Sequence, residues 1–285
     1  MKTGLVMEGG AMRGMFTAGV TDVMMENGIT YDGAVGVSAG AVFGCNYKSR
    51  QPGRVIRYNK RFAKDWRFCS VRSLLLTGDL FGAEFCYKTI PQDLDYFDVE
   101  AFAENPMNFY VVCTDMETGR AVYHNCLKGD ERDLKWMRAS ASMPLASRAV
   151  VIDGRKLSDG GTADSIPLRY MQHKGYDKNV VILTQPPTYR KKLQKSFGAI
   201  EAGLFRYPVL ARALKARPER YNRSVEYVRS EEAAGRAFVI CPRESLNIGH
   251  TEHDPAELER VYQIGRAEAE KRLPELMEFL KEDVR

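Results

Sequence analysis

Ser38 is the residue whose setting most clearly predicts chemistry. It stands at the centre of Gly36-Val37-Ser38-Ala39-Gly40, a G-x-S-x-G pattern that follows a short apolar segment and precedes several small residues. This order predicts a strand, a sharp turn and a helix, the geometry that lifts a nucleophilic serine hydroxyl out of a sheet. Glycine is needed two residues to either side, because larger side chains would clash with the neighbouring strand and helix. A tight turn that merely contains a serine is the alternative, so the pattern needs support from the rest of the chain.

A glycine-rich loop follows the first predicted strand, at Gly9-Gly10-Ala11-Met12-Arg13-Gly14. A dinucleotide fingerprint would need glycine at Ala11 and an acidic partner about 20 residues on, and the nearest acid, Asp32, precedes the next strand. The G-K-[ST] of a Walker A loop is absent. Two interpretations remain, an oxyanion hole formed by backbone N–H groups and a tight strand-to-helix turn. Ala11 keeps its N–H, so the loop retains this donor.

Two Asp-Gly turns lie close together in the second half of the chain. Asp153-Gly154 joins two apolar arms and is explained by the chemistry of a two-residue hairpin turn. Asp159, in Ser158-Asp159-Gly160-Gly161, has no such explanation, because the two glycines could form the turn alone. A carboxylate at the exit of a strand is a candidate base for Ser38.

The three motifs occur in one order along the chain, and together they resemble the patatin-like phospholipase family over about residues 2–185. In that family a glycine-rich loop ending in arginine and glycine forms the oxyanion hole. The G-x-S-x-G serine is the nucleophile, and the aspartate of a D-G-G/A motif is its only side-chain partner. The stretch Ala139-Ser140-x-x-x-Pro144 also resembles a block of the family. Ala11 departs from the family pattern, which usually has a third consecutive glycine there, and this affects loop flexibility more than chemistry.

The resemblance implies an α/β protein with a three-layer α/β/α fold and a mostly parallel central sheet. It implies a Ser38–Asp159 dyad that cleaves carboxylic ester bonds of lipids or phospholipids through an acyl-enzyme, without a cofactor. The other implied site residues are those of the oxyanion loop, the elbow and the Asp-Gly-Gly motif: Gly9, Gly10, Ala11, Met12, Arg13 and Gly14; Gly36, Val37, Ala39 and Gly40; Gly160 and Gly161.

The dyad places physical demands on its surroundings. A carboxylate with an ordinary pKa of ~3.9 is a poor base for a serine hydroxyl, so burial must raise the pKa of Asp159. The amides of residues 9–12 and of Ala39 would carry the negative charge of the transition state. Arg13 would either hold the loop or bind an anionic head group.

Two other functions remain open at this point. An α/β-hydrolase-type esterase would use Ser38, Asp159 and then His250 or His253 in chain order. A non-catalytic module on the same fold would bind lipid or a partner. The chain has only four histidines, and no pair has zincin spacing near a glutamate, so we expect no metal site.

The composition is that of an ordinary globular protein, with 285 residues and a formal net charge of +5. No apolar run approaches the ~20 residues of a membrane span, and Glu8 interrupts the N-terminal apolar stretch before a signal peptide could form. The six cysteines are scattered and form no C-x-x-C pair, which indicates free thiols in a reducing compartment. We therefore expect a cytoplasmic protein with peripheral membrane contact.

We expect a single patatin-like domain over residues 1–285, with a core at about 2–185 and a helical, basic extension at about 186–285. Apolar runs predict strands at 3–7, 108–114, 120–124, 150–152, 155–157, 179–184 and 237–241. Apolar periodicity predicts helices at 15–27, 130–142, 164–174 and 254–280, the last broken at Pro274. The helix at 164–174, between two strands, indicates a βαβ layout.

Two further segments carry open interpretations. Residues 50–105 are either a helical excursion with a solvated basic face or a cap that supplies an apolar acyl pocket. In the segment 190–223, basic residues dominate and Glu201 and Glu219 are the only acids. No recognition motif accompanies this charge, so we expect no nucleic-acid partner. The segment is either a solvated helical face or a contact with an anionic membrane. The oligomeric state is left open.

Overall fold

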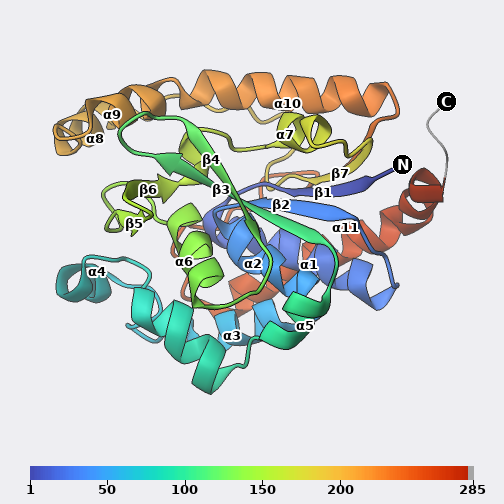
Figure 1. Cartoon of the computed structure of the whole chain (residues 1–285), viewed down its shortest axis with the longest axis horizontal. Helices are drawn as coiled ribbons and strands as arrows, with labels where there is room; N and C mark the ends of the chain where they lie inside the picture. The colour runs from blue at the N-terminus through green and yellow to red at the C-terminus, as the bar shows by residue number, and fades with distance from the viewer. Residues whose placement is uncertain (282–285) are drawn as a thin grey trace.

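A mostly parallel sheet lies between two layers of helices in the computed structural model of the chain, which describes residues 1–281 (Figure 1). Its strands are β1 (Thr3–Met7), β2 (Gly33–Val37), β3 (Asn108–Asp115), β4 (Ala121–Cys126), β5 (Val150–Ile152), β6 (Arg155–Asp159), β7 (Lys178–Ile182) and β8 (Ala237–Ile240). The spatial order is β5-β6-β3-β2-β1-β7-β8, and β4 pairs with β3. The predicted three-layer α/β/α fold is confirmed.

The helices come from every part of the chain. They are α1 (Gly14–Glu26), α2 (Ala39–Lys48), α3 (Arg54–Phe62), α4 (Val71–Thr77), α5 (Val99–Glu104), α6 (Glu131–Ser140), α7 (Leu168–His173), α8 (Phe197–Gly203), α9 (Pro208–Lys215), α10 (Arg217–Ala233) and α11 (Pro255–Lys281). Short 3-10 turns cover Ala11–Arg13 and Gly160–Thr162, and a π-helical segment covers Phe85–Leu94. No helix within residues 1–281 has the length and apolar composition that crossing a membrane requires.

Each face of the sheet has its own apolar core. Leu5 and Met7 of β1 point to the face covered by α1, α2 and α11, whereas Val6 points to the face covered by α7 and α10 (Figure 1). This alternation follows from the period of two residues along a strand. Strand β8 and helices α10 and α11 belong to the C-terminal extension, so the extension completes both layers and one end of the sheet.

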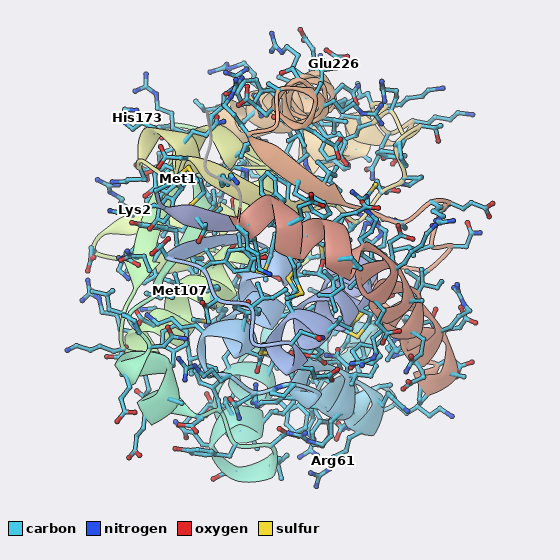
Figure 2. All side chains as sticks on the ribbon, turned by 90° about the vertical axis from the view of Figure 1, so that its right-hand side faces the viewer. Met1, Lys2, Arg61, Met107, His173 and Glu226 are labelled. Carbon is cyan, nitrogen blue, oxygen red and sulfur yellow. The ribbon has the colours of Figure 1, made fainter. Side chains whose placement is uncertain are left out.

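The parallel strands direct the chemistry-bearing loops to one side of the molecule. β1 pairs in parallel with β2 and β7, and β2 pairs in parallel with β3. Met1, Lys2 and Met107, which precede β1 and β3, lie at the amino ends of these strands (Figure 2). The glycine loop and Ser38 follow the carboxyl ends of β1 and β2, at the opposite edge, where α/β proteins bind ligands.

Strand β3 has three partners on two edges. Residues 109–114 pair with β4 on one edge. On the other edge β3 pairs with β2 as far as Val112, opposite Val37, and then with β6 from Cys113, opposite Asp159. β6 therefore takes the place that β2 vacates where the chain turns at Ser38. This pairing brings Asp159 next to Ser38.

Three predictions about secondary structure were wrong. The C-terminal helix runs through Pro274 without a break; a proline removes one hydrogen bond, and Ala269 and Leu276, buried on either side, keep both halves packed. Helix α7 begins at Leu168 rather than at residue 164, because the Asp164 carboxylate accepts from the Tyr123 hydroxyl instead of capping a helix.

The third wrong prediction is the βαβ layout around α7. The strand before this helix, β6, runs antiparallel to β3, so α7 does not join two parallel neighbours. The hairpin turn at Asp153 sets this direction, since it reverses the chain between β5 and β6. The last four residues of the predicted domain, 282–285, lie outside the described residues.

Candidate active site

Ser38 stands in the turn between β2 and α2 with φ of 54° and ψ of −120°. Few residues with a Cβ adopt a positive φ, and a nucleophile elbow is one place where they do. A Cβ on Gly36 would lie 2.3 Å from the carbonyl oxygen of Gly40, and a Cβ on Gly40 would lie 2.4 Å from that of Met7. Both glycines are required because α2 and β1 approach so closely, as the sequence predicts.

The backbone of the turn is held by a serine of another helix. The amide of Ser38 donates to Oγ of Ser140 at 2.9 Å, and the Ser140 hydroxyl donates to the carbonyl of Val112 at 2.6 Å. Ser140 is fully buried at the end of α6. Ser140 therefore links the elbow to β3. The backbone N–H of Ser38 is occupied by this hydrogen bond.

Asp159 is the last residue of β6 and is 7% exposed. Its carboxylate accepts a hydrogen bond from the amide of Gly161 at 2.8 Å, and the residue lines the same pocket as Ser38. Burial raises the pKa of Asp159 above its ordinary value, while Arg217, Ser38 and the Gly161 amide act in the opposite direction. The structure thus brings together the predicted nucleophile and the predicted base, and burial gives the base the expected direction of shift.

The glycine loop packs against the elbow. A Cβ on Gly9 would lie 2.9 Å from Cβ of Ser38, so the loop touches the serine. Within residues 1–281, the backbone N–H groups of Gly9, Gly10 and Ala11 donate no hydrogen bond. Ala39 is the first residue of α2, so its N–H has no acceptor within the helix. An oxyanion hole would need free backbone donors of this kind close to the serine.

The other predicted residues support these groups. Val37 is fully buried at the end of β2, and the Met12 side chain lines an apolar pocket. A Cβ on Gly14 would lie 2.9 Å from Cβ of Ala39, so α1 and α2 meet there. A Cβ on Gly160 would lie 2.1 Å from the carbonyl oxygen of Val112 in β3.

Glu8 fixes the chain just before the glycine loop. It is 2% exposed, and its carboxylate accepts from the amide of Thr184 at 2.6 Å and from the hydroxyl of Tyr221 at 2.8 Å. Burial raises the pKa of Glu8, and these two hydrogen bonds oppose the rise. The residue therefore joins the exit of β1 to the segment after β7 and to α10.

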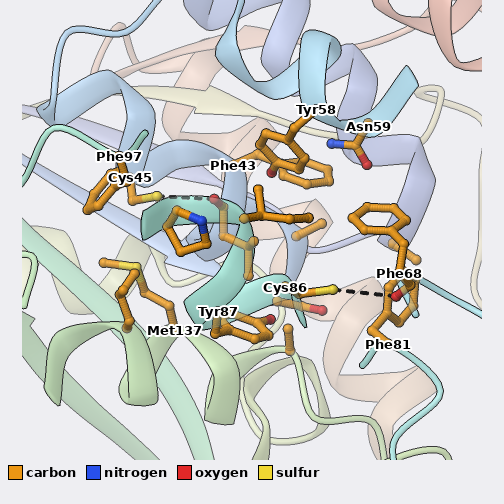
Figure 3. A pocket seen from close by; sticks show the side chains of 18 of the residues that line it. Phe43, Cys45, Tyr58, Asn59, Phe68, Phe81, Cys86, Tyr87, Phe97 and Met137 are labelled. Carbon is orange, nitrogen blue, oxygen red and sulfur yellow. Dashed lines mark hydrogen bonds between the residues drawn. The ribbon is translucent and has the colours of Figure 1, made fainter. Parts of the chain in front are cut away.

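Ser38 lines an apolar pocket, which Figure 3 shows from close by. Phe43 and Cys45 of α2, Tyr58 of α3, Tyr87 of the π-helical segment and Met137 of α6 line it. Nearly half of its lining residues come from residues 54–97, so the segment 50–105 covers the elbow, as one of its two interpretations expected. Its lining is mostly apolar and aromatic, as in many small-molecule sites.

Ser38 also lines a second pocket, in which apolar side chains lie beside a polar part formed by Asp159, Arg13, Lys191 and Arg217. This part is called the polar pocket below. Burial, then Arg217, lowers the pKa of Lys191 to about 8. His250 lines this pocket, but no hydrogen bond in the described part of the chain joins its ring to Ser38 or Asp159. Nδ1 of His253 lies 2.8 Å from the carbonyl oxygen of Ala63 at the end of α3, and His253 is not among the residues that line the pocket.

A group of potential metal ligands lies elsewhere. His124, Cys126 and Asp133 bring one ligand atom each within 4.8 Å of one another. The Asp133 carboxylate already accepts from the amides of Lys128 and Gly129 and lies 3.3 Å from Nε2 of His124. These hydrogen bonds fix the loop between β4 and α6, which explains why Asp133 lies beside His124 and Cys126.

Four supporting residues were missed from the sequence. Ser140 was noted only as part of a block of the resembling family, and Glu8 only as an interruption of an apolar run. Lys191 and Arg217 were two of many cations in the segment 190–223. The sequence signal for Glu8 was its position between an apolar strand and a glycine loop, where a buried acid needs hydrogen-bond partners.

Comparison with known families gives two matches along the chain. The family model described as patatin-like phospholipase matches residues 5–171, and a domain of unknown function, DUF6363, matches residues 207–281. The uncharacterized protein YjjU of Escherichia coli is 26% identical over 286 residues, which cover 92% of this chain and 74% of that protein.

Two further similarities involve longer chains. Lysophospholipase nte1 of Aspergillus niger is 29% identical over 184 residues, 61% of this chain, and the chain spans only 11% of its length. The crystal structure of VipD from Legionella pneumophila aligns with a TM-score of 0.47 and 13% identity over 96% of this chain and 67% of that one. The match of the family model covers more than half of the sequence, and the chain belongs to the patatin-like phospholipase family.

Proposed function

We propose that the chain is a serine lipid acyl hydrolase that cleaves carboxylic ester bonds through a Ser38–Asp159 dyad. The observation that carries this proposal is that Ser38 and the buried Asp159 line one pocket, which contains Arg13, Lys191 and Arg217, and that Ser38 also lines a second, apolar pocket. An ester with an apolar acyl chain and a polar leaving group matches this division. Membership of the family supports lipid hydrolysis in general terms.

The proposed reaction has two steps. The Ser38 oxygen attacks the ester carbonyl while Asp159 accepts the hydroxyl proton, and the free amides of the glycine loop and of Ala39 stabilise the oxyanion. Protonated Asp159 then gives its proton to the departing alkoxide, which leaves an acyl-enzyme on Ser38. Water, deprotonated by Asp159, attacks the acyl carbonyl, and the serine oxygen recovers the proton.

A panel of lipids and p-nitrophenyl esters tests this proposal. Wild type should hydrolyse at least one long-chain ester, and Ser38→Ala and Asp159→Asn should each lose turnover while remaining folded. Full activity of Asp159→Asn would refute the dyad. Activity that disappears in His250→Ala or His253→Ala as well as in Asp159→Asn would instead support the triad of an α/β-hydrolase-type esterase. A folded protein inert toward every ester would support a non-catalytic binding module.

We further propose that the mouth of the site contacts an anionic membrane through the segment 190–223. Leu193 and Phe205, which are 45% and 74% exposed, stand among exposed cations of this segment. Exposed Leu75 and Leu76 belong to α4, on the same side of the molecule as α8 and α9 (Figure 1). Apolar insertion and attraction of about 1 kcal/mol per Lys or Arg near the surface would act together.

Vesicle sedimentation tests this contact. Wild type should bind vesicles rich in anionic lipid more strongly than neutral ones, and Phe205→Asp should weaken both. Equal binding to anionic and neutral vesicles would count against the basic segment. We also propose that the chain works as a single domain, and its six free cysteines support a reducing location such as the cytoplasm.

A further inference from the structure

Three cations from three separate parts of the chain line the polar pocket beside Ser38. Arg13 ends the glycine loop, Lys191 follows β7, and Arg217 begins α10. Among residues 1–281 the structure gives none of the three side chains an ion pair with a carboxylate. Glu8 and Asp159 lie near enough to attract these cations but form no ion pair with them, so three positive charges face two carboxylates. Like charges repel one another, and an anion that joined the cluster would relieve this repulsion.

Two hydrogen-bond donors in this cluster are buried without an acceptor. Nε of Arg13 and Nε of Arg217 have no hydrogen-bond partner within the described residues. A buried donor without a partner is costly, and the cost is larger for a charged group. Burial and the neighbouring Arg217 also lower the pKa of Lys191, to about 8. An incoming oxyanion would accept hydrogen bonds from both guanidinium groups and favour the charged form of the lysine.

Helix α10 holds the cluster in place. The side chain of Asn222 accepts from the Lys191 amide at 2.8 Å and donates to the Lys191 carbonyl at 3.0 Å. The Tyr221 ring lies 4.7 Å from the Lys191 ammonium, and its hydroxyl donates to the Glu8 carboxylate. The cations are therefore fixed on a rigid helix and its contacts rather than carried on a free surface loop.

Arg217 also reaches the predicted base. A Cβ on Gly161 would lie 3.0 Å from Nη2 of Arg217 and 3.0 Å from Oδ1 of Asp159, so both groups flank the same glycine. An anion bound by this guanidinium would lie beside the reacting serine. This is the place that the leaving group of an ester occupies when its acyl chain fills the apolar pocket.

We propose that Arg13, Lys191 and Arg217 form a subsite for the phosphate of an anionic lipid head group, completed by the first turns of α10. The proposal rests on the proposed ester hydrolysis at Ser38, since it names the substrate class for that site. Guanidinium groups match phosphate oxygens in pairs, and the lysine adds a compact charge. A zwitterionic head group brings its own cation toward this cluster and is disfavoured. Residues 207–281, which match the domain of unknown function, thus supply part of the active site.

Binding to full-length Ser38→Ala tests the subsite without turnover. The probes are monomeric lysophosphatidylglycerol, lysophosphatidylcholine with the same acyl chain, and inorganic phosphate, each measured by calorimetry. Lysophosphatidylglycerol should bind the most tightly, and Arg217→Ala or Lys191→Met should weaken it about tenfold or more, with little change for lysophosphatidylcholine. Arg229→Ala, an exposed arginine about 18 Å further along α10, is the matched control and should change neither.

Each outcome separates one interpretation. Equal affinity for the two lysolipids, with equal losses in Arg217→Ala, would refute the subsite. Inorganic phosphate that binds as tightly as lysophosphatidylglycerol would indicate a site for free phosphate and would refute the head-group assignment. Arg217→Lys, which keeps the charge and loses the paired donors, should recover only part of the binding. The turnover assays of wild type, Ser38→Ala and Asp159→Asn test the proposed ester hydrolysis. The binding data test only the subsite, so the two proposals can fail separately.

Discussion

The backbone amide of Ser38 donates a 2.9 Å hydrogen bond to the hydroxyl of Ser140. Ser140 in turn donates to Val112, the residue of β3 opposite Val37. A single buried hydroxyl thus holds an unfavourable turn against the sheet. It also means that the Ser38 amide is already engaged, so the oxyanion must be received by the amides of the glycine loop and of Ala39.

Ser140→Ala should reduce both stability and activity. It leaves the Ser38 amide and the Val112 carbonyl without partners, at a cost of about 1–3 kcal/mol. A displaced serine should also lower kcat by about tenfold or more, because small misplacements in active sites are costly. Thermal unfolding and ester turnover measure the two effects. Ser49→Ala, which removes a buried hydroxyl at the far end of α2, should lower stability only. Unchanged kcat in Ser140→Ala would contradict this role.

Ala11→Gly should stabilise the protein. Ala11 has φ of 48°, in the left-handed region that glycine adopts without strain, and relief of this strain is worth about 1 kcal/mol. The melting temperature should rise by about 2–4 °C, and kcat should stay close to that of wild type since the backbone N–H is retained. Ala11→Val is the opposing control and should lower the melting temperature. A lower melting temperature in Ala11→Gly would show that the alanine methyl group contributes packing that outweighs the strain.

Val42→Phe should shorten the acyl chain that the enzyme accepts. Val42 lies one helical turn after Ser38 in α2 and lines the apolar pocket. A phenyl group there should lower kcat/KM for a long-chain p-nitrophenyl ester by about tenfold or more relative to the acetate. Because the acetate needs no deep pocket, it serves as the control within the same variant. An unchanged ratio would place the acyl chain elsewhere.

The acid limb of the pH profile should report Asp159. Its pKa is raised by burial, so kcat/KM for a neutral p-nitrophenyl ester should rise with pH through an inflection above the ordinary range of an aspartate. Arg217 and Lys191 favour the charged form of this carboxylate, as do the Ser38 side chain and the hydrogen bond from the Gly161 amide. Removing positive charge disfavours the carboxylate and raises its pKa further.

Arg217→Ala should therefore move the inflection to higher pH, and Lys191→Met should move it in the same direction by less. The control Arg229→Ala should leave it in place. A shift to lower pH in Arg217→Ala would contradict the electrostatic role of this residue.

Local patterns were enough to predict the elbow, the glycine loop and most strands. Gly36 and Gly40 are informative because their spacing reflects two backbone contacts, with α2 and with β1. The hairpin at Asp153 was also predictable from the sequence, because an Asp-Gly pair between two apolar segments is typical of a two-residue hairpin turn. The fold class followed from these motifs and from the family they resemble.

The proximity of Ser38 and Asp159 could not be derived from local patterns. It depends on β6 continuing the edge of β3 that β2 leaves at Val37, which is a pairing between distant segments. The roles of Arg217 and Tyr221 could not be predicted for a similar reason. Only the packing of α10 over the end of the sheet separates them from the other polar residues of their segment.

Labelling by a fluorophosphonate probe tests the central claim most directly. The probe reacts with an activated serine and requires no knowledge of the natural ester. Wild type should be labelled at Ser38, as located by peptide mass spectrometry, Ser38→Ala should not be labelled, and Asp159→Asn should react at least about a hundredfold more slowly because the base is lost. Absence of labelling in folded wild type, or an undiminished labelling rate in Asp159→Asn, would contradict the Ser38–Asp159 dyad.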